Sequence, residues 1–575
     1  MKKLKGIANI SSPLNFKPEH LFEIGKRENN PKRDFLFINK LLGKHIEVSP
    51  TVVKATGHLL AGIKYNDITG ADAKDVYILA EYLKNQSRHN KKDEKYFEEK
   101  TKNIVNHHKY VFSNISNISN NSNNSNINLD NDKNENFKNK RVLVIGFAET
   151  ATALGMSVAA SIKNCDYQST TRENFSTISY KEHKTDTSKT VEINKRFSFE
   201  EEHSHATTHN LYNAYLNRAG DIVCNKDINF QKYSEIILVD DEISTGKTIC
   251  NIIKELCKET KVKNYSVLSI MDWRNEECKE MSKQLKNEEN IEIKYYSLMS
   301  GNLVYFDDGK TINNTREDIQ DNKQFIKNDN VLDTYKKQID ETSKELIFSS
   351  PISVKRTDNN LMKIETDTHN YLYEKSGRFL LSSKQINDID DEINNFMKNH
   401  NLLKEIDLMI KNINYNKYNE IKNTIIPKLK KSTALYGNPM ERIVYSLEHT
   451  LNNNPIENIQ KNKHQTKILV LSEGEDMYIP SRIAFYLEKH GYNVKFKTTT
   501  RSPIAVDGKT IQTKDSYLAT HLYNPYTYEN DLKNKKYYFY NKQLCAEKYN
   551  LVLCIFERTS VLTIDEDNFR TLFIE

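Results

Sequence analysis

The sequence predicts an α/β protein built on a parallel β-sheet with helices on both of its faces. One observation is the run IILV at residues 236–239, which is apolar at every position, as expected of a strand buried on both sides. A second observation is that such strands alternate with helical patterns in the order strand, loop, helix. In a sheet of this kind, ligands bind at the carboxyl ends of the strands.

The first region of the chain contains most of the expected elements. Apolar spacing favours helices at 35–42, 52–63 and 73–83, and Pro50 and Thr51 mark the start of the second. The alternating part then predicts strands at 142–145, 166–170, 235–239 and 265–271, with helices at 150–162 and 248–257.

A second α/β region lies towards the carboxyl end. Its expected elements are strands at 467–471, 493–498 and 550–556 and a helix at 480–489. We therefore expect a first domain at 1–310, a polar linker at 311–345 with a solvated helix at 330–339, and a second domain at 346–575. Residues 113–140 are rich in Asn and charge, so they are expected to be a disordered insertion in the first domain.

The second region is similar to a diverged copy of the first. RVLVIGFAETATALG and DYQSTTREN parallel KILVLSEGEDMYIPS and KFKTTTRSP. Further along, HATTHNLYNAY (205–215) parallels YLATHLYNPY (517–526), and EIILVDDEISTG parallels NLVLCIFERTS. In the last pair Cys554 and Ile555 replace the acids Asp240 and Asp241, so the second copy is not expected to bind the same ligand in the same way.

Composition narrows the class of protein. The 575 residues are enough for two or three domains, and 84 Lys and Arg nearly balance 78 Asp and Glu, leaving a net charge of +6. No basic run marks a nucleic-acid surface, and no segment approaches the ~18 consecutive apolar residues of a membrane helix. Seven scattered cysteines without a C-x-x-C pair suggest reduced thiols. We expect a cytoplasmic protein that binds neither nucleic acid nor membrane.

The most informative motif is IILVDDEISTGKT at residues 236–248. Asp240 and Asp241 end the strand, and two neighbouring carboxylates beside an anion site indicate bound sugar hydroxyls with Mg2+ nearby. A Walker A loop is excluded, because Asp241 stands where that motif needs Gly. An ordinary strand end with capping residues is the alternative. The residues expected to bind a phosphate at the start of the next helix are Ile243, Ser244, Thr245, Gly246, Lys247 and Thr248.

A second strand-to-helix loop consists of Gly146, Phe147, Ala148 and Glu149. Its small residues let backbone N–H groups approach a diphosphate, whereas Glu149 suggests Mg2+ or a substrate amine or hydroxyl. A plain turn is the alternative. Past the next strand, Arg172 is either a partner of diphosphate oxygens or a surface arginine, and Arg501 holds the corresponding place in the second region.

A third segment, FEEEHSHATTH at 199–209, gathers three carboxylates and three imidazoles. Glu202, His203 and His205 are candidates for general acid or base catalysis or for Mg2+ binding. A zinc site built on the imidazoles and an exposed loop without a chemical role are the alternatives.

Together, these motifs resemble those of type I phosphoribosyltransferases, whose pattern is four apolar residues, two acids, a short stretch and Thr-Gly-x-Thr. The resemblance implies that Asp240 and Asp241 hold the ribose 2′- and 3′-hydroxyls of 5-phosphoribosyl-1-diphosphate (PRPP). It further implies that residues 244–248 wrap the 5′-phosphate and that residues 146–149 bind the pyrophosphate. Residues 199–209 would then be the mobile catalytic loop that excludes water.

Nearly the whole chain resembles the phosphoribosyltransferase plus TRSP-domain proteins of bacterial tellurite-resistance and stress-response gene clusters. In the first domain the resemblance is carried by NPKRDFLFINKLLGKHI (30–46), GFAETATALG and EEEHSHATTHNLY. In the second domain it is carried by SGRFLL, which includes Gly377, Arg378 and Phe379, and by the TRSP tetrapeptide at 500–503. The resemblance implies a type I phosphoribosyltransferase-like domain followed by a diverged, phosphoribosyltransferase-like TRSP domain.

The hypothesis from sequence is a Mg2+-dependent phosphoribosyltransferase. It would transfer ribose 5-phosphate from PRPP to a base-like nitrogen nucleophile with release of pyrophosphate, in the synthesis or salvage of a nucleotide-like metabolite, and Asp240 and Asp241 would hold the metal. The alternative is a regulatory module that senses PRPP or a nucleotide without turnover. The Glu and His segment at 199–209 favours the enzyme, because a sensor has no need of it. A homodimer is compatible with either.

Overall fold

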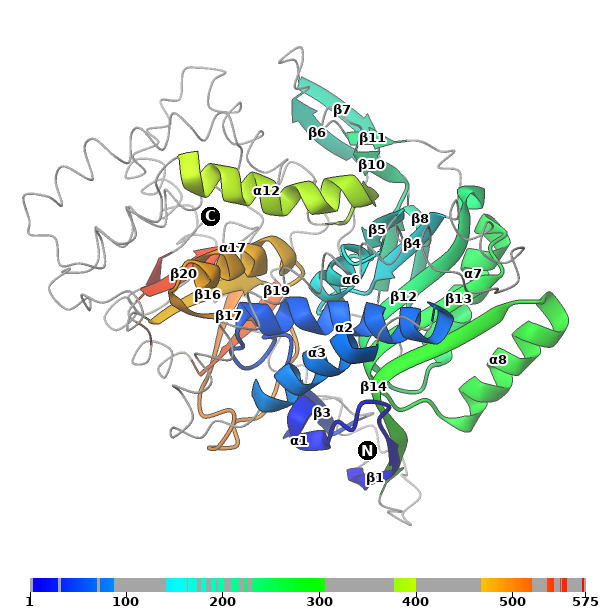
Figure 1. The fold of residues 1–575 in the computed structure, drawn as a ribbon, viewed down its shortest axis with the longest axis horizontal. Helices are drawn as coiled ribbons and strands as arrows, with labels where there is room; N and C mark the ends of the chain where they lie inside the picture. The colour runs from blue at the N-terminus through cyan, green and yellow to red at the C-terminus, as the bar shows by residue number, and fades with distance from the viewer. Residues whose placement is uncertain are drawn as a thin grey trace, which may run out of the picture.

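The computed structural model shows two α/β halves packed against each other (Figure 1). We call residues 4–305 the first half and residues 377–572 the second half. The structure describes residues 4–28, 33–69, 73–86, 141–162, 164–172, 177–181, 188–192, 195–200, 208–216, 222–224, 230–305, 377–399, 467–519, 535–541, 549, 551–555 and 571–572. The expected insertion at 113–140, the linker at 311–345 with its helix, and the segment 201–207 lie outside the described residues.

A seven-stranded sheet forms the centre of the first half, in the order β1-β14-β13-β12-β4-β5-β15. Its five middle strands are parallel, as predicted, and the two edge strands are antiparallel to their neighbours. The strands are β1 (Leu4–Ser11), β4 (Arg141–Gly146), β5 (Cys165–Ser169), β12 (Tyr233–Ile243), β13 (Asn264–Asp272), β14 (Glu292–Tyr305) and β15 (Leu381–Ser382). The last of these comes from the second half, so the two halves share this sheet.

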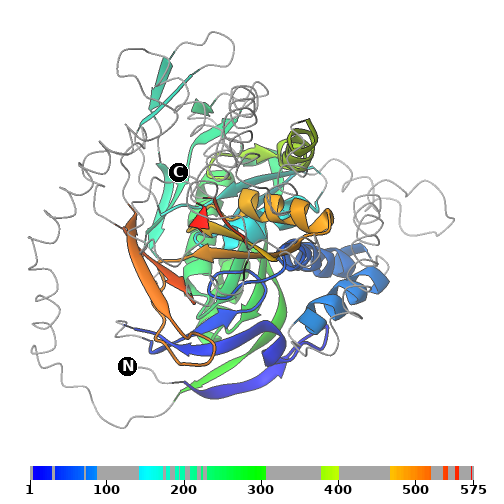
Figure 2. The ribbon, with the colours of Figure 1, turned by 90° about the vertical axis from the view of Figure 1, so that its left-hand side faces the viewer.

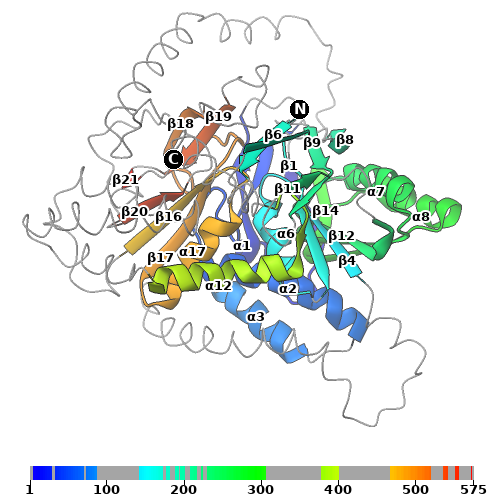
Figure 3. The same cartoon turned by 90° about the horizontal axis from the view of Figure 1, so that it is seen from above.

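Helices cover both faces of the seven-stranded sheet. Helices α2 (Pro50–Thr69) and α6 (Ala151–Ala159) lie on one side, and α7 (Lys247–Thr260) and α8 (Glu276–Glu289) lie on the other (Figure 3). Burial on both faces explains why the four residues Ile236, Ile237, Leu238 and Val239 are all apolar, since each is fully buried. None of the described helices is both long enough and apolar enough to cross a bilayer.

The amino-terminal part differs from the prediction. A strand, β3 (Phe35–Asn39), forms where we expected a helix at 35–42, and it pairs with β2 (Phe22–Lys26) as an antiparallel hairpin. The aromatic residues are the reason, because Phe37 packs against Phe22 and Trp273 with ring centroids 4.7 and 5.3 Å apart. Two short helices, α1 (Pro18–Leu21) and α3 (Ala73–Gln86), flank this hairpin and α2.

Between β5 and β12 the described residues form three antiparallel hairpins. The pairs are β6 (Thr177–Lys181) with β7 (Ser188–Glu192), β8 (Lys195–Glu200) with β9 (Thr208–Tyr212), and β10 (Ala214–Leu216) with β11 (Ile222–Cys224). A single 3-10 turn, η1 (Phe230–Lys232), then leads into β12.

The second half contains a four-stranded parallel sheet in the order β17-β16-β20-β21. Its strands are β16 (Lys467–Glu473), β17 (Asn493–Thr499), β20 (Leu551–Ile555) and β21 (Thr571–Leu572), and α17 (Tyr478–Lys489) connects the first two. A hairpin of β18 (Lys514–Ala519) and β19 (Lys535–Tyr540) follows β17. These elements appear close to their predicted bounds.

The strand register corrects one detail of the internal comparison. In the first half Leu238 pairs with Ile145 of β4, and in the second half Cys554 pairs with Leu471, the counterpart of Ile145, in β16. Cys554 therefore corresponds to Leu238 rather than to an acid, and Ile555 corresponds in the same way to Val239. The acid pair corresponds to Phe556 and Glu557, which lie outside the described residues.

The two halves pack through helices α2, α6, α17 and α12 (Ser383–Asn399) (Figure 3). At the centre of this layer, Asp390 of α12 accepts two hydrogen bonds from Arg482 of α17, at 2.6 and 2.5 Å. Lys54 of α2 joins them at 3.4 Å. The second half also reaches the amino-terminal hairpin, where Ala505 N donates to Lys26 O at 2.9 Å (Figure 2). One hydrophobic core cluster includes side chains of both halves.

Candidate functional site

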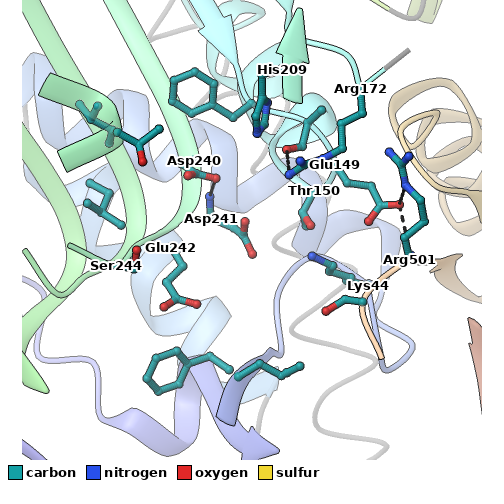
Figure 4. A pocket seen from close by; sticks show the side chains of 18 of the residues that line it. Lys44, Glu149, Thr150, Arg172, His209, Asp240, Asp241, Glu242, Ser244 and Arg501 are labelled. Carbon is teal, nitrogen blue, oxygen red and sulfur yellow. Dashed lines mark hydrogen bonds and ion pairs between the residues drawn. The ribbon is translucent and has the colours of Figure 1, made fainter. Parts of the chain in front are cut away.

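A pocket lies at the carboxyl ends of β4 and β12, where a parallel sheet is expected to bind its ligand (Figure 4). Both halves and the amino-terminal hairpin contribute to its walls. The lining residues are Arg27, Arg33, Leu36, Phe37, Lys44, His45, Phe147, Ala148, Glu149, Thr150, Arg172, His209, Asp240, Asp241, Glu242, Ile243, Ser244, Gly246, Thr248, Ile249, Ile252, Arg501 and Ser502.

The predicted acid pair lies in this pocket. Asp240 and Asp241 are half-buried, and the backbone N–H of Asp241 donates to Asp240 Oδ1 at 2.8 Å. The strand does not stop at Asp240, as we predicted, but continues to Ile243. The pairing of β12 with β13 as far as Asp272 explains this extension and gives both carboxylates a rigid backbone.

The loop after the acid pair turns sharply into α7. Gly246 has φ +78°, and a Cβ at this position would lie 2.4 Å from Cys278 Sγ of α8, so both backbone conformation and space require glycine. Ser244, Gly246 and Thr248 line the pocket next to the helix amino terminus, which favours an anion there. Thr245 and Lys247 are not among the lining residues, and Lys247 Nζ lies 3.9 Å from Glu277 Oε1.

The predicted pyrophosphate loop also reaches the pocket, through Phe147, Ala148 and Glu149 but not through Gly146. Its backbone N–H groups have partners within the fold: Phe147 N donates to Val239 O at 3.0 Å, and Ala148 N donates to Thr170 Oγ1 at 2.9 Å. The main-chain cradle that we expected there is therefore only partly available.

Glu149 contacts the second half. Its carboxylate accepts hydrogen bonds from Thr500 Oγ1 at 3.0 Å and from Arg501 N at 3.4 Å, and Arg501 Nε lies 3.7 Å from it. These contacts give the carboxylate partners within the protein. The suggestion that Glu149 holds Mg2+ or a substrate group gains no support from this geometry.

Arg172 lines the pocket as predicted, but its groups are engaged. Its backbone N–H donates to Glu475 Oε1 at 2.9 Å, and its guanidinium donates to Ala148 O at 3.2 Å. Next to it, the buried ring of His209 lies with Nδ1 3.0 Å from Thr170 Oγ1 and packs edge-on against Phe147. The candidates Glu202, His203 and His205 lie outside the described residues.

The sequence did not identify the residues that close the pocket from the amino-terminal side. Arg33 forms an ion pair with Glu242 at 2.8 Å and stacks over the Phe35 ring at 4.2 Å. Burial raises the pKa of Glu242, and the charge of Arg33 opposes that rise. Leu36 and Phe37 add an apolar surface suited to a planar ligand. These amino-terminal residues lie in the string NPKRDFLFINKLLGKHI (30–46), which contributed to the family resemblance, but no role was assigned to any residue within it.

Lys44 and His45 enter the pocket from the turn before α2 (Figure 4 labels Lys44). His45 is buried and packs edge-on against the ring of Tyr540 in the second half. Burial, followed by the charges of Lys44 and Lys497, holds the pKa of His45 well below its usual value. With the imidazole neutral, Lys44 is the cation of this turn.

Comparisons with known proteins agree with the fold of the first half. Residues 21–302 match the family model described as phosphoribosyl transferase, and residues 441–567 match the model of the TRSP domain found C-terminal to it. These matches support the architecture that the sequence motifs predicted, a phosphoribosyltransferase-like α/β domain with a parallel-centred sheet flanked by helices, followed by a TRSP domain.

Other comparisons add little. Among solved structures, adenine phosphoribosyltransferase from Trypanosoma brucei, in complex with AMP, pyrophosphate and ribose-5-phosphate, is 10% identical, with a TM-score of 0.23. That match covers 50% of this chain and 80% of the trypanosomal chain. No curated protein matches the sequence.

Proposed function

We propose that the first half is a Mg2+-dependent phosphoribosyltransferase that transfers ribose 5-phosphate from PRPP to a nitrogen of a base-like acceptor. The observation that carries the proposal is that the acid pair and the loop after it line one pocket, within a region that matches a phosphoribosyl transferase family model. The lining residues are Asp240, Asp241, Ser244, Gly246 and Thr248. A stress-related role rests on the sequence resemblance alone.

In this proposal the sugar is held by carboxylates and the phosphate by the helix start. Asp240 and Asp241 accept hydrogen bonds from the ribose 2′- and 3′-hydroxyls, and the Gly246 turn offers its N–H groups to the 5′-phosphate. The acceptor nitrogen forms a bond to C1 as the C1–O bond breaks, and pyrophosphate leaves with that electron pair. The proton of the nitrogen passes to a base, for which Glu202, His203 and His205 are our candidates.

The residues fit Mg2+ only as an ion shared with the substrate. Within the described part of the chain, no three His, Cys, Asp or Glu side chains lie together as a metal site. Mg2+ commonly uses one or two carboxylates together with water and substrate phosphates, and Asp240 and Asp241 supply that number. When bound, the ion would neutralise charge on the leaving pyrophosphate.

We also propose that the second half is a diverged copy of the first. The order β17-β16-β20-β21, with all strands parallel, supports this, because it repeats the order β5-β4-β12-β13 of the first half. In the first half the chain runs from β4 through α6 to β5, and in the second half it runs in the same way from β16 through α17 to β17. A chance origin of the sequence repeat would not predict this common topology.

The experiment compares the protein with its Asp241→Asn variant by calorimetric titration with PRPP and Mg2+ and by assay of pyrophosphate release with a panel of bases. We expect the variant to bind PRPP about tenfold or more weakly, because a charged hydrogen-bond acceptor is lost. Its rate should fall on the order of 10²-fold or more. Asp391→Asn, an exposed acid on α12, is the control.

Undiminished binding by Asp241→Asn would overturn the ribose assignment. Tight PRPP binding by the unmodified protein without pyrophosphate release from any base would instead favour the sensing module.

A further inference from the structure

The two halves contact each other through residues that hold the same place in each half. Glu149 and Glu475 stand at the same distance from the first residues of β4 and β16. In one direction, Glu475 accepts hydrogen bonds from Thr171 Oγ1 at 2.6 Å and from Arg172 N at 2.9 Å. The loop after β16 in the second half therefore binds the segment after β5 in the first.

The same contact occurs in the opposite direction. Glu149 accepts hydrogen bonds from Thr500 Oγ1 at 3.0 Å and from Arg501 N at 3.4 Å. Thr500 and Arg501 are the counterparts of Thr171 and Arg172 in the paired strings KFKTTTRSP and DYQSTTREN. A donor and acceptor arrangement repeated in both directions is the signature of an isologous, two-fold interface.

Two glycines extend this relation to the outer edges of the sheets. Ser169 N donates to Gly377 O at 2.6 Å, so the segment before α12 pairs with the edge of β5. Its counterpart Thr498 N donates to Gly43 O at 2.8 Å, so the segment before α2 pairs with the edge of β17. Both glycines have positive φ, +88° and +78°. Each half thus places the segment before one of its helices against the edge of a sheet of the other half.

The hairpins β8–β9 and β18–β19 also correspond to each other in the two halves. Gln168 Nε2 donates to Tyr212 O at 2.7 Å, and its counterpart Lys497 Nζ donates to Tyr540 O at 2.6 Å. Strand β9 therefore corresponds to β19, and not to residues 517–526, as the sequence comparison had suggested. The chain is arranged as an internal pseudo-dimer in which the second half takes the place of a second subunit.

This arrangement brings cations of the interface to the pocket of the first half. The pocket carries four carboxylates, Glu149, Asp240, Asp241 and Glu242, which repel a polyanionic substrate. Arg501 of the second half lines it, with its guanidinium 3.2 Å from Glu475 and 3.7 Å from Glu149. Figure 4 shows Arg501 on the side opposite Asp240 and Asp241.

Lys44 lies on that same side, and the second half fixes its position. The turn that carries it is held to β17 by Thr498 N on Gly43 O and by the mutual backbone hydrogen bonds of Val48 and Phe496, at 2.9 and 2.7 Å. Within the described residues, no carboxylate lies within ion-pair distance of Lys44 Nζ, although the side chain lines the pocket. A half-buried ammonium ion without an acid partner favours an anionic ligand.

We propose that the second half completes the pyrophosphate end of the first-half site. It supplies Arg501 itself, and it positions Lys44 of the first half because β17 holds the turn that carries this residue. This inference rests on the proposed function and deepens it. Lys44 and Arg501 bind the oxygens of the diphosphate, while Asp240, Asp241 and the Gly246 loop hold the ribose and its 5′-phosphate. The TRSP domain is then a substrate-binding partner of the phosphoribosyltransferase domain within one chain.

The test measures binding of two fragments of PRPP, inorganic pyrophosphate with Mg2+ and ribose 5-phosphate, by calorimetry on the full chain. Arg501→Ala and Lys44→Ala should each weaken pyrophosphate binding about tenfold or more and leave ribose 5-phosphate within about twofold, because each removes a charge-assisted contact to one fragment only. Arg501→Lys should recover part of the loss. Lys509→Ala, which removes an exposed cation of the second half, is the control.

The two fragments separate the possible outcomes. If Arg501→Ala and Lys44→Ala bind pyrophosphate as the unmodified protein does, or lose both fragments in parallel, the inference is wrong. If Arg501→Ala does not fold, Lys44→Ala decides the question, since its side chain forms no ion pair across the interface among the described residues. Failure of the unmodified protein to bind either fragment would instead count against the proposed function itself.

Discussion

The carboxyl ends of β12 and β20 hold the same place in two related sheets but differ in chemistry. The last part of β12 carries Asp240 and Asp241 and a small loop follows the strand, whereas the sequence after β20 places Phe556 where Asp240 stands in the first half. The sequences of the two strands, IILV at 236–239 and LVLCI at 551–555, are similarly apolar. The strand order is thus common to both halves, and the acid pair occurs in the first.

The strand-to-helix loops after β4 and after β16, by contrast, are similar in the two halves. Glu149 and Glu475 are both retained, and both bind the partner half through a Thr hydroxyl and an Arg backbone N–H. What is common to the halves is therefore the interface between them. The second half therefore repeats the interface residues of the first half but not its acid pair.

The largest expected effect concerns this interface. Glu475 is fully buried and pairs with Arg378 and Arg501 at 3.4 and 3.2 Å, so Glu475→Gln should lower the free energy of unfolding by about 3–5 kcal/mol. Glu149→Gln should cost less, about 1–2 kcal/mol, because Glu149 opens onto the pocket. Urea denaturation of the two variants measures the difference. Equal losses would contradict the unequal burial of charge that we describe.

A smaller effect is expected at two glycines with similar backbone conformations. Gly246→Ala should lower the free energy of unfolding by about 2–4 kcal/mol, because the positive φ and the 2.4 Å approach of a Cβ to Cys278 Sγ act together. The variant should also bind PRPP more weakly. Gly508 in the second half has φ +70° and nothing within 4 Å, so Gly508→Ala should cost about 1 kcal/mol and leave binding unchanged. Thermal unfolding and PRPP titration measure both effects. An equal loss in the two variants would show that packing against α8 is unimportant.

Much of the fold was predictable, because strands buried on both faces carry a strong local signal. The runs RVLVIG, IILV and KILVL identified β4, β12 and β16, and the resemblance of DDEISTGKT to a known motif identified the wall of the pocket that they support. The helix expected at 35–42 was wrong, because aromatic packing of Phe35 and Phe37 in a hairpin overrides local apolar spacing.

The rest of the site was not predictable from local patterns. Arg33 and Lys44 were not singled out from the sequence, and Arg501 was singled out only as the counterpart of Arg172. The three residues come from segments far apart in the sequence, and only tertiary structure brings them to one pocket. The alignment of β20 with β12 was wrong by two residues for a similar reason, because two apolar runs can be aligned in several registers and strand pairing is needed to choose among them. The interface between the halves left one readable trace, the repeat of TTR at 170–172 and 499–501.

The most direct test is a crystal structure of the full chain with PRPP and Mg2+. The account predicts the ribose hydroxyls on Asp240 and Asp241, the 5′-phosphate at the Gly246 turn, and the diphosphate beside Lys44 and Arg501. A PRPP molecule bound at the strand ends of the second half, or with its diphosphate away from both cations, would contradict it.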